Sequence, residues 1–467
     1  MMPERDAVIA MLPEHSLLAG IVVLILLEVF GVRKVWPTWI AIAVTCAAAA
    51  IAFRLASMEG AWHLFDGQLV IDGGALHAKG ALLALAVPVL LMAKSEFSDG
   101  EFSILLLSSL YGLCIAVSSQ NFLPLFLGLE LASLPVYALV LLAYRRPQSA
   151  EAALKYLVLS GAATATLLMG VSLLYGATGS MGVSDFVLAV QGGEGFSQIA
   201  VILVFVALFL KAAVVPFHSW APDAYEGASV PVTAYMSTLM KGAVVIVAAT
   251  LVALVPVSGP LAGLLYALPL ASIVWGNLAA IRQNSFRRMI AYSSIAHAGY
   301  LFYAIPGSPF ARRSAVLFYV VTYAVANLLA FAVLPRHEHD EKRDDLENLR
   351  GLYLRDPVAA VLIAIAMLSL AGLPPLPGFV AKFYIFRNLI AAGHTTYAVL
   401  GLLGSYLGMY FYLRVIVRMF MAERTAVWSE PRWNEQRADG MAQTAGWLCL
   451  AATVLLTVVP GWVIAQF

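Results

Sequence analysis

Long apolar stretches, each close to the length that crosses a lipid bilayer, follow one another along almost the whole chain. A helix needs about 20 predominantly apolar residues to cross the hydrocarbon core. In lipid every backbone N–H and C=O must also be paired within the protein, which leaves helices and closed barrels as spanning structures. The candidate spans lie approximately at 16–32, 37–56, 76–93, 103–120, 122–144, 150–176, 197–217, 228–255, 260–281, 288–306, 314–335, 357–391, 396–421 and 443–464. The chain is therefore predicted to be an all-α membrane protein of about 14 transmembrane helices, forming a single polytopic membrane domain over residues 1–467.

The composition and the cysteine pattern exclude several other classes of protein. Charged residues make up 12% of the chain and hydrophobic residues 61%, whereas a soluble domain carries about 25% charge. Cys46, Cys114 and Cys449 stand singly in apolar stretches, so neither a metal site nor a disulfide framework is indicated. Neither a P-loop nor a GxGxxG motif occurs, and the net charge of +1 gives no sign of nucleic-acid binding. The first apolar run has no small-residue cleavage site and is interpreted as a retained first span.

The positive charges between the spans indicate an orientation. Loops on one side carry eighteen of them, namely Arg33, Lys34, Lys94, Arg145, Arg146, Arg282, Arg287, Arg288, Arg336, Lys342, Arg343, Arg350, Arg355, Arg414, Arg418, Arg424, Arg432 and Arg437. The other side has six, namely Arg5, Arg54, Lys79, Arg312, Arg313 and Arg387. Because Lys and Arg accumulate in cytoplasmic loops, both termini are predicted to lie outside the cytoplasm. The cytoplasmic loop 336–356 is either a solvated connection or a docking surface, and its His337 and His339 are interpreted as solvated.

Two candidate spans cannot be simple helices. Residues 357–391 would reach about 52 Å as one straight helix, and prolines interrupt them in GLPPLPGF. The stretch 197–226 is interrupted by Pro216. Proline removes a backbone donor and clashes with the preceding turn, and paired interruptions in two halves of a transporter point to an ion path. Spans 4–8 and 9–13, at 103–255 and 260–421, are therefore predicted to be two inverted five-helix repeats with one broken helix each.

Three lysines and one glutamate lie inside the apolar runs: Lys211, Lys241, Lys382 and Glu130. Each isolated charge at the bilayer centre costs about 2.5–3.5 kcal/mol on insertion scales, and such residues mark ion or proton paths by default. Burial allows a lysine to exchange a proton near neutral pH, while an adjacent carboxylate opposes this. The four residues are predicted to form a proton path in which the Glu130–Lys211 pair acts as a switch. A purely structural ion pair is the competing interpretation.

Four further residues are candidate relay groups with competing structural roles. Lys155 lies near the end of a span, where a lysine usually extends to the interface. His218 follows Pro216 and either caps the helix break or transfers protons. His297 is a candidate because histidine side chains in general titrate near neutrality; it lies between Lys241 and Lys382 in the sequence and acts either as a relay or as a packing residue. Tyr300 holds water or joins helices by hydrogen bonding.

Several segments resemble one known family. They include LGLELASLPVYALV, PFHSWAPDAYEGA, YSSIAHAGY and AMLSLAGLPPLPGFVAKFYIF. On these residues the chain resembles, over nearly its whole length, the antiporter-like subunits of respiratory complex I, the bacterial NADH:quinone oxidoreductase. Lysine at 382 and the GLELASLPVYAL segment favour the subunit N (ND2) branch. Ser229, where relatives commonly carry proline, and Pro377 depart from the family pattern, and neither departure removes a titratable group.

The resemblance implies 14 transmembrane helices with helices 7 and 12 broken, and a proton channel whose key groups match Glu130, Lys211, Lys241 and Lys382. It also makes Lys155 a plausible participant. The implied protein is a proton-translocating subunit in a bacterial inner membrane, with FMN, iron–sulfur clusters and quinone in partner subunits and none in this chain. The partners are other membrane subunits and, through them, a peripheral redox arm. A multisubunit sodium/proton antiporter or a hydrogenase-linked membrane complex is the alternative on the same scaffold.

Overall fold

Helices make up almost all of the structure, a computed structural model that describes residues 4–31, 36–58, 60–94, 96–97, 100–143, 147–192, 195–253, 259–306, 309–335, 344–421 and 440–466. The helices are α1 (Glu4–Ala10), α2 (Leu12–Val29), α3 (Trp36–Ala56), α4 (Gly73–Ala93), α5 (Glu101–Ser118), α6 (Phe122–Leu142), α7 (Pro147–Thr178), α8 (Val183–Gly192), α9 (Phe196–Ala212), α10 (Trp220–Gly227), α11 (Val230–Tyr235), α12 (Lys241–Leu251), α13 (Gly259–Ile281), α14 (Phe286–Tyr303), α15 (Pro309–Ala332), α17 (Leu352–Arg355), α18 (Pro357–Ala371), α19 (Pro377–Ala391), α20 (Thr395–Phe420), α22 (Gly440–Val458) and α23 (Pro460–Gln466). A short antiparallel hairpin, β1 (Trp62–Leu64) and β2 (Leu69–Ile71), pairs Trp62 with Ile71.

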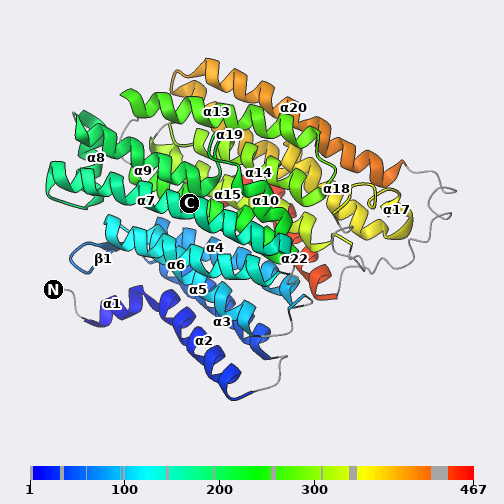
Figure 1. Ribbon diagram of the computed structural model, residues 1–467, viewed down its shortest axis with the longest axis horizontal. Helices are drawn as coiled ribbons and strands as arrows, with labels where there is room; N and C mark the ends of the chain where they lie inside the picture. The colour runs from blue at the N-terminus through cyan, green and yellow to red at the C-terminus, as the bar shows by residue number, and fades with distance from the viewer. Residues whose placement is uncertain are drawn as a thin grey trace.

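The long helices run side by side in one bundle (Figure 1). Helices α2 and α3 form one edge and α20 the opposite edge, while the hairpin and α17 mark the two ends (Figure 1). At the centre, Val230–Leu251 is buried along its whole length and Arg312–Ala332 almost so. Apolar side chains from most of the helices form one continuous core. The centre of the bundle is therefore closed to lipid, and it is there that polar side chains require partners.

The helices agree with the predicted membrane class. Within the described ranges, eleven helices are long and apolar enough to cross a membrane, or twelve if the bent pair α8–α9 forms one span. These eleven coincide with eleven of the predicted spans. The other three predicted spans, 197–217, 288–306 and 357–391, also fall on helices. Their helices are shorter, as in α9 and α18, or contain many polar residues, as in α14.

Both of the predicted helix breaks are present. Helix α9 ends at Ala212 and is followed by Ala213, which has the left-handed φ of 59°; α10 begins after Pro216 at Trp220. Helix α18 ends at Ala371 and is followed by Gly372, whose φ is 80°; α19 begins at Pro377. A left-handed residue terminates a helix, and a following proline cannot continue it. Backbone carbonyls are thereby released inside the bundle in two places.

A third irregularity lies directly before one of the predicted lysines. Residues Met236–Met240 form a π-helical turn, η1, between α11 and α12. A π-turn is usually found at functional sites because it inserts an extra residue and redirects the side chains that follow. Lys241 is the first residue of α12. No sequence pattern predicted this turn.

Two helix pairs approach each other closely through glycine. A Cβ on Gly112 of α5 would lie 2.4 Å from the backbone nitrogen of Ala132 in α6. A Cβ on Gly276 of α13 would lie 2.6 Å from the backbone nitrogen of Ala296 in α14. Small residues let membrane helices pack backbone to backbone. The pairs α5–α6 and α13–α14 therefore pack in the same way, and they carry Glu130 and His297.

One assignment made from the sequence is wrong. Lys79, which was counted among the loop charges on the hairpin side, is fully buried two turns into α4. It pairs with Glu14 of α2, which is also buried. A sequence position near the start of an apolar run does not distinguish a lysine that reaches water from one that meets an acid. Of the predicted loop 336–356, residues 336–343, including His337 and His339, lie outside the described residues.

Candidate functional site

Glu130 and Lys211 form an ion pair inside the bundle. The Lys211 Nζ lies 3.0 Å from Glu130 Oε1, and both side chains are largely buried. The hydroxyl of Thr164 donates to the same oxygen at 2.5 Å. Lys211 also donates to the hydroxyls of Ser133 and Ser160, each at 3.3 Å. Helices α6, α7 and α9 thus share one polar cluster, because every charged atom removed from water needs a partner.

Lys241 is buried without a carboxylate. Its ammonium donates to the backbone oxygen of Ser294 at 2.8 Å and to the Ser294 hydroxyl at 2.5 Å. Within the described ranges no Asp or Glu pairs with it. Lys241 and Lys211 both line one internal cavity of about 20 Å³, together with Ser133, Ser160 and other side chains. A cavity of this size and polarity accommodates a water molecule, so the two lysines face a common hydrated space.

Beyond Lys241, hydroxyls and an imidazole continue along α14. Ser293, the neighbour of Ser294, is hydrogen bonded to the Tyr412 hydroxyl of α20. That hydroxyl lies 3.2 Å from His297 Nε2, and Tyr319 of α15 lies 2.9 Å from His297 Nδ1. One turn of helix separates His297 from Ser293, so the imidazole and the serines share a face of α14. The structure places His297 in the interval between Lys241 and Lys382.

Lys382 lies at the second helix break. Its ammonium donates to the free carbonyls of Leu370 and Ala371 at 3.1 and 3.0 Å, and to Ser405 Oγ at 2.9 Å. The carboxyl end of α18 carries partial negative charge, which favours a cation there. Lys382 Nζ also lies 4.9 Å from the centre of the Tyr300 ring, a cation–π distance. Lys382 and His297 both line a small cavity of about 10 Å³, which is at the lower limit for holding one water molecule.

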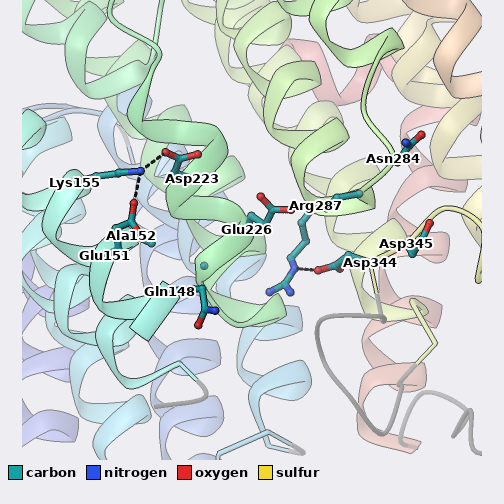
Figure 2. A pocket seen from close by; sticks show the side chains of 12 residues that line it. Gln148, Glu151, Ala152, Lys155, Asp223, Glu226, Asn284, Arg287, Asp344 and Asp345 are labelled. Atoms are coloured by element: carbon teal, nitrogen blue, oxygen red, sulfur yellow. Dashed lines mark hydrogen bonds and ion pairs between the residues drawn. The ribbon is translucent and has the colours of Figure 1, made fainter. Parts of the chain in front are cut away.

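Glu130, Lys211, Lys241, His297 and Lys382 are called the lysine row below. Lys155 lies apart from this row, in an open vestibule of about 580 Å³ (Figure 2). Its ammonium sits between Glu151 at 2.7 Å and Asp223 at 2.8 Å, and 43% of its side chain is exposed. Arg288 completes the network by pairing with Asp223 and Glu226. On the opposite wall Arg287 points to Asp344 and pairs with it (Figure 2). The vestibule is thus lined by charges of both signs, contributed by α7, α10, α14 and the segment that follows α15.

The vestibule and the internal cavity approach each other along α7. Ala152 lines the vestibule, while Tyr156, one turn further, lines the cavity that holds Lys211 and Lys241. The Tyr156 ring stacks on Trp220 of α10, with ring centres 4.6 Å apart. Trp220 donates in turn to the Leu210 carbonyl at 3.0 Å, at the break of α9. Two stacked aromatic rings therefore separate the open vestibule from the buried lysines.

His218 takes a different place from the other candidates. Its Nε2 accepts a hydrogen bond of 2.9 Å from the indole of Trp275 in α13. This contact joins the break after α9 to a neighbouring helix. Among the described residues, His218 makes no hydrogen bond to Lys211, Lys241 or Lys382. Of the two roles predicted for His218, the geometry favours the structural one at the helix break over proton transfer.

Sequence reasoning missed most of the polar neighbours of these residues. Thr164, Ser160, Tyr412, Tyr319 and Ser405 stand singly in apolar runs, where hydroxyl side chains are common and carry no spacing signal. Asp223 lies in the PFHSWAPDAYEGA segment, where no spacing signal pointed to its ion pair with Lys155. Within the described ranges, no group of three His, Cys, Asp or Glu side chains is arranged to hold a metal ion.

Residues 119–408 match the protein family described as NADH:quinone oxidoreductase/Mrp antiporter, TM. The matched region contains every member of the lysine row. Among the known proteins, NADH-quinone oxidoreductase subunit N of Pelobacter propionicus is 38% identical, and the alignment covers 98% of each chain.

Solved structures give the same picture. A chain of respiratory complex I from Thermus thermophilus superposes with a TM-score of 0.83 at 33% identity, covering 97% of this chain and 98% of that one. A chain of the Mrp complex from Dietzia sp. DQ12-45-1b reaches the same TM-score at 20% identity, covering 97% and 96%. The second likeness shows the fold alone.

Proposed function

The chain belongs to the family of NADH-quinone oxidoreductase subunit N, and from this premise we propose that it translocates protons through its row of buried lysines. The resemblance inferred from the sequence is thereby confirmed. The observation that carries the proposal is the continuity of polar groups at the centre of an otherwise apolar bundle. Glu130 and Lys211 share a hydrogen bond, Lys211 and Lys241 share one cavity, and His297 and Lys382 share another. Between Lys241 and His297 lie the hydroxyl of Ser294, that of the adjacent Ser293 and that of Tyr412.

The Glu130–Lys211 pair is the proposed switch. While Glu130 is ionised and 3.0 Å away, its charge stabilises the Lys211 ammonium, because opposite charges attract strongly in a medium of low dielectric. A change in the field around Glu130, or a movement of its carboxylate, removes that stabilisation. Lys211 then gives its proton to the shared cavity, where Lys241 is the next acceptor.

Lys241 and Lys382 suit transfer because, among the described residues, no carboxylate pairs with either ammonium group; hydroxyls and carbonyls, and for Lys382 the Tyr300 ring, stabilise them instead. A buried charge without a counter-charge is held weakly, so a proton that arrives at Lys241 passes on readily. The route to Lys382 uses Ser294, Ser293, Tyr412 and His297, whose hydroxyl and imidazole groups both donate and accept. His297 and Lys382 then meet at their common cavity.

We propose that protons enter this row from the charged vestibule. Its acidic side chains, Glu151, Asp223 and Glu226, attract protons. Its basic side chains, Lys155 and Arg288, hold these carboxylates in place by ion pairs. The stacked rings of Tyr156 and Trp220 form the barrier between the vestibule and Lys211. Lys155, although outside the row, thereby takes part as a charge at the entrance.

The topology proposed with this function has 14 transmembrane helices, with α9–α10 as broken helix 7 and α18–α19 as broken helix 12. Both breaks and the two glycine-packed pairs, α5–α6 and α13–α14, support inverted repeats at 103–255 and 260–421. The charge distribution supports an orientation with the vestibule toward the cytoplasm and both termini in the periplasm. The membrane is the inner membrane of a bacterium.

Electron transfer is assigned to partner subunits of the same complex. FMN, iron–sulfur clusters and quinone belong to those subunits in the proposal, and this chain contributes the proton route. The partners are further membrane subunits and the peripheral redox arm that they connect.

The composition of the purified complex tests the function. We expect gentle purification through a tag on this chain to recover subunits that carry flavin and iron–sulfur clusters, together with NADH:quinone oxidoreductase activity. Recovery of sodium/proton antiporter subunits, or of a hydrogenase, without NADH oxidation would overturn the proposal and favour the alternative on the same scaffold.

A further inference from the structure

A second ion pair is buried in the bundle, outside the lysine row. Lys79 Nζ of α4 lies 2.5 Å from Glu14 Oε1 of α2, and the two side chains are 0% and 1% exposed. Taking two charges out of water costs several kcal/mol for each ion, and a well-packed apolar pair of similar volume is often as stable or more so. The pair is therefore poorly explained by stability alone.

Its surroundings leave both partners short of hydrogen bonds. The ion pair is the only polar contact of either side chain among the described residues. Both oxygens of Glu14 and the ammonium of Lys79 otherwise lack a hydrogen-bond partner there. A carboxylate accepts at about four lone-pair positions and an ammonium donates three protons. The unused positions are suited to water or to groups that exchange protons.

The pair lies toward the end of the bundle that carries the β-hairpin. Lys79 is the seventh residue of α4, which places it about 10 Å along that helix at 1.5 Å per residue. A small apolar cluster lies between the pair and that end, formed by Ala10, Met11, Leu55, Leu64, Leu69, Ile71 and Leu76. Beside it, Ala75 and Ala78 of α4 and Val117 of α5 line a cavity of about 30 Å³, with Arg312 and Arg313 also in its wall. The cavity has room for water.

A hydrogen-bonded pair of hydroxyls lies beside the segment that precedes Lys241. Helix α4 packs against α11 and η1, the segments that precede Lys241. The Tyr235 hydroxyl of α11 is 2.7 Å from Ser109 Oγ of α5, and Ser109 contacts the sulfur of Met240 at 3.7 Å. Met240 is the neighbour of Lys241 in the chain.

The Cys114 thiol of α5 lies near both the buried ion pair and Tyr235. It lies more than one turn beyond Ser109 on α5 and interacts electrostatically with Glu14, Lys79 and Tyr235. Tyr111 of α5 interacts with Glu14 as well. Glu14 therefore faces the titratable groups of α5, while Lys79 stands beside the cavity-lining face of α4.

We propose that Glu14 and Lys79 form a second proton-exchanging pair, which connects Lys241 to the hairpin end of the bundle. The inference rests on the proposed proton translocation and adds a branch to it. A proton arriving from Tyr235 and Ser109 by way of water binds to the Glu14 carboxylate. Lys79 then releases one of its own protons to water in the cavity. The proton on Glu14 moves across to the Lys79 amine, and the original ion pair is restored with one proton taken up and one released.

Two variants separate proton exchange from a structural role. Lys79→Arg keeps the positive charge beside Glu14, but a guanidinium cannot give up its proton in a protein. The double variant Glu14→Leu with Lys79→Leu removes both charges together, so no unpaired charge stays buried. We expect both variants to assemble into the complex and to oxidise NADH, with a loss of protons pumped per NADH in reconstituted liposomes.

Full pumping per NADH by either assembled variant would overturn the inference, because a structural pair tolerates both changes. Should the double variant fail to assemble, Lys79→Arg alone decides the question, since its ion pair is kept. Lys241→Ala, measured in the same preparation, separates this inference from the proposed function. Pumping lost in Lys241→Ala but retained in the pair variants contradicts only the branch, whereas pumping retained in Lys241→Ala contradicts the lysine row itself.

Discussion

Lys211 of α9 lies 3.0 Å from Glu130 of α6, although 81 residues separate them in the chain. The hydroxyls of Thr164, Ser133 and Ser160 surround the pair, so both charges are held in fixed positions. Charge-assisted hydrogen bonds are roughly twice as strong as neutral ones. A small change at Glu130 is therefore transmitted directly to the Lys211 proton.

Replacing Glu130 with Gln removes the counter-charge of Lys211 and keeps the size of the side chain. We expect the assembled complex to lose most of its proton pumping, because Lys211 no longer holds a proton until the switch opens. The measurement is NADH-driven acidification or alkalinisation in reconstituted liposomes. Glu347→Gln is the matched control, because its carboxylate is 46% exposed and pairs with Arg350 outside both the lysine row and the vestibule, and exposed pairs contribute about 1 kcal/mol or less. Equal pumping by the Glu130→Gln variant and the wild type would contradict the switch.

Replacing Thr164 with Val removes the hydroxyl that donates to Glu130 and keeps the shape of the side chain. A lost hydrogen bond to a charged group is worth about 1.5–3 kcal/mol. We expect a lower melting temperature of the complex and weaker pumping, without complete loss. Thr164→Ser, which retains the hydroxyl, serves as the control. An unaltered melting temperature and full pumping in Thr164→Val would show that this hydroxyl does not hold Glu130.

Substitutions at and beside His297 show whether its imidazole relays protons or only packs. His297→Phe fills a similar volume but cannot exchange protons with Tyr412 or Tyr319, which lie 3.2 and 2.9 Å from the imidazole nitrogens. We expect pumping to fall while the complex still assembles. Tyr319→Phe removes a hydrogen bond to the imidazole but leaves the route from Tyr412 to Lys382 open, so it should pump more than His297→Phe. If both variants pump equally well, the imidazole is a packing group.

Gly372 has a left-handed backbone conformation and lies directly against the Lys382 side chain. Its φ is +80°, and a Cβ there would lie 2.9 Å from Lys382 Cδ. Gly372→Ala is expected to combine backbone strain, about 1–3 kcal/mol for a sparsely populated conformation, with displacement of the lysine. Stability and pumping should both fall. Gly393→Ala shares a positive φ of 85° but has open space around it, so it should lose stability alone. Equal pumping by the two variants would contradict the role of this contact.

Substitutions of Tyr300 test whether its aromatic ring stabilises the Lys382 ammonium. Tyr300→Phe keeps an aromatic face 4.9 Å from the ammonium and loses the hydrogen bond from Asn277. Tyr300→Leu removes the face, which is worth about 2 kcal/mol or more where the cation is desolvated. We expect Tyr300→Leu to lower pumping and thermal stability more than Tyr300→Phe does. The opposite order would mean that the hydroxyl, and not the ring, supports Lys382.

The membrane class, the two helix breaks and the four central charged residues were predictable from the sequence, for physical reasons. Apolar run length, prolines and misplaced charges are all local properties of the chain. The π-turn before Lys241 was not predictable, since it depends on how η1 packs between its neighbours. Nor were Thr164, Tyr412 and Ser405, because a hydroxyl in an apolar run acquires a role only from the helix that it meets.

Glu14 and Lys79 illustrate the same limit more sharply. Glu14 follows Pro13 in the first turn of α2, and Lys79 lies near the start of its apolar run. Both positions match side chains that reach the membrane surface. Only the packing of α2, α4 and α5 brings the two charges together in the interior. In the same way, the packing of α7 against α10 places Lys155 in an ion network at the vestibule, where its sequence position alone suggested a simple interfacial lysine.

The most direct test of the account is the number of protons pumped per NADH by the reconstituted complex carrying Lys241→Ala. Lys241 is the point at which the Lys211 cavity and the α14 hydroxyls meet. We expect the variant to assemble, to oxidise NADH and to lose proton pumping through this subunit. Full wild-type pumping per NADH in the assembled variant would contradict the proposed route through the lysines.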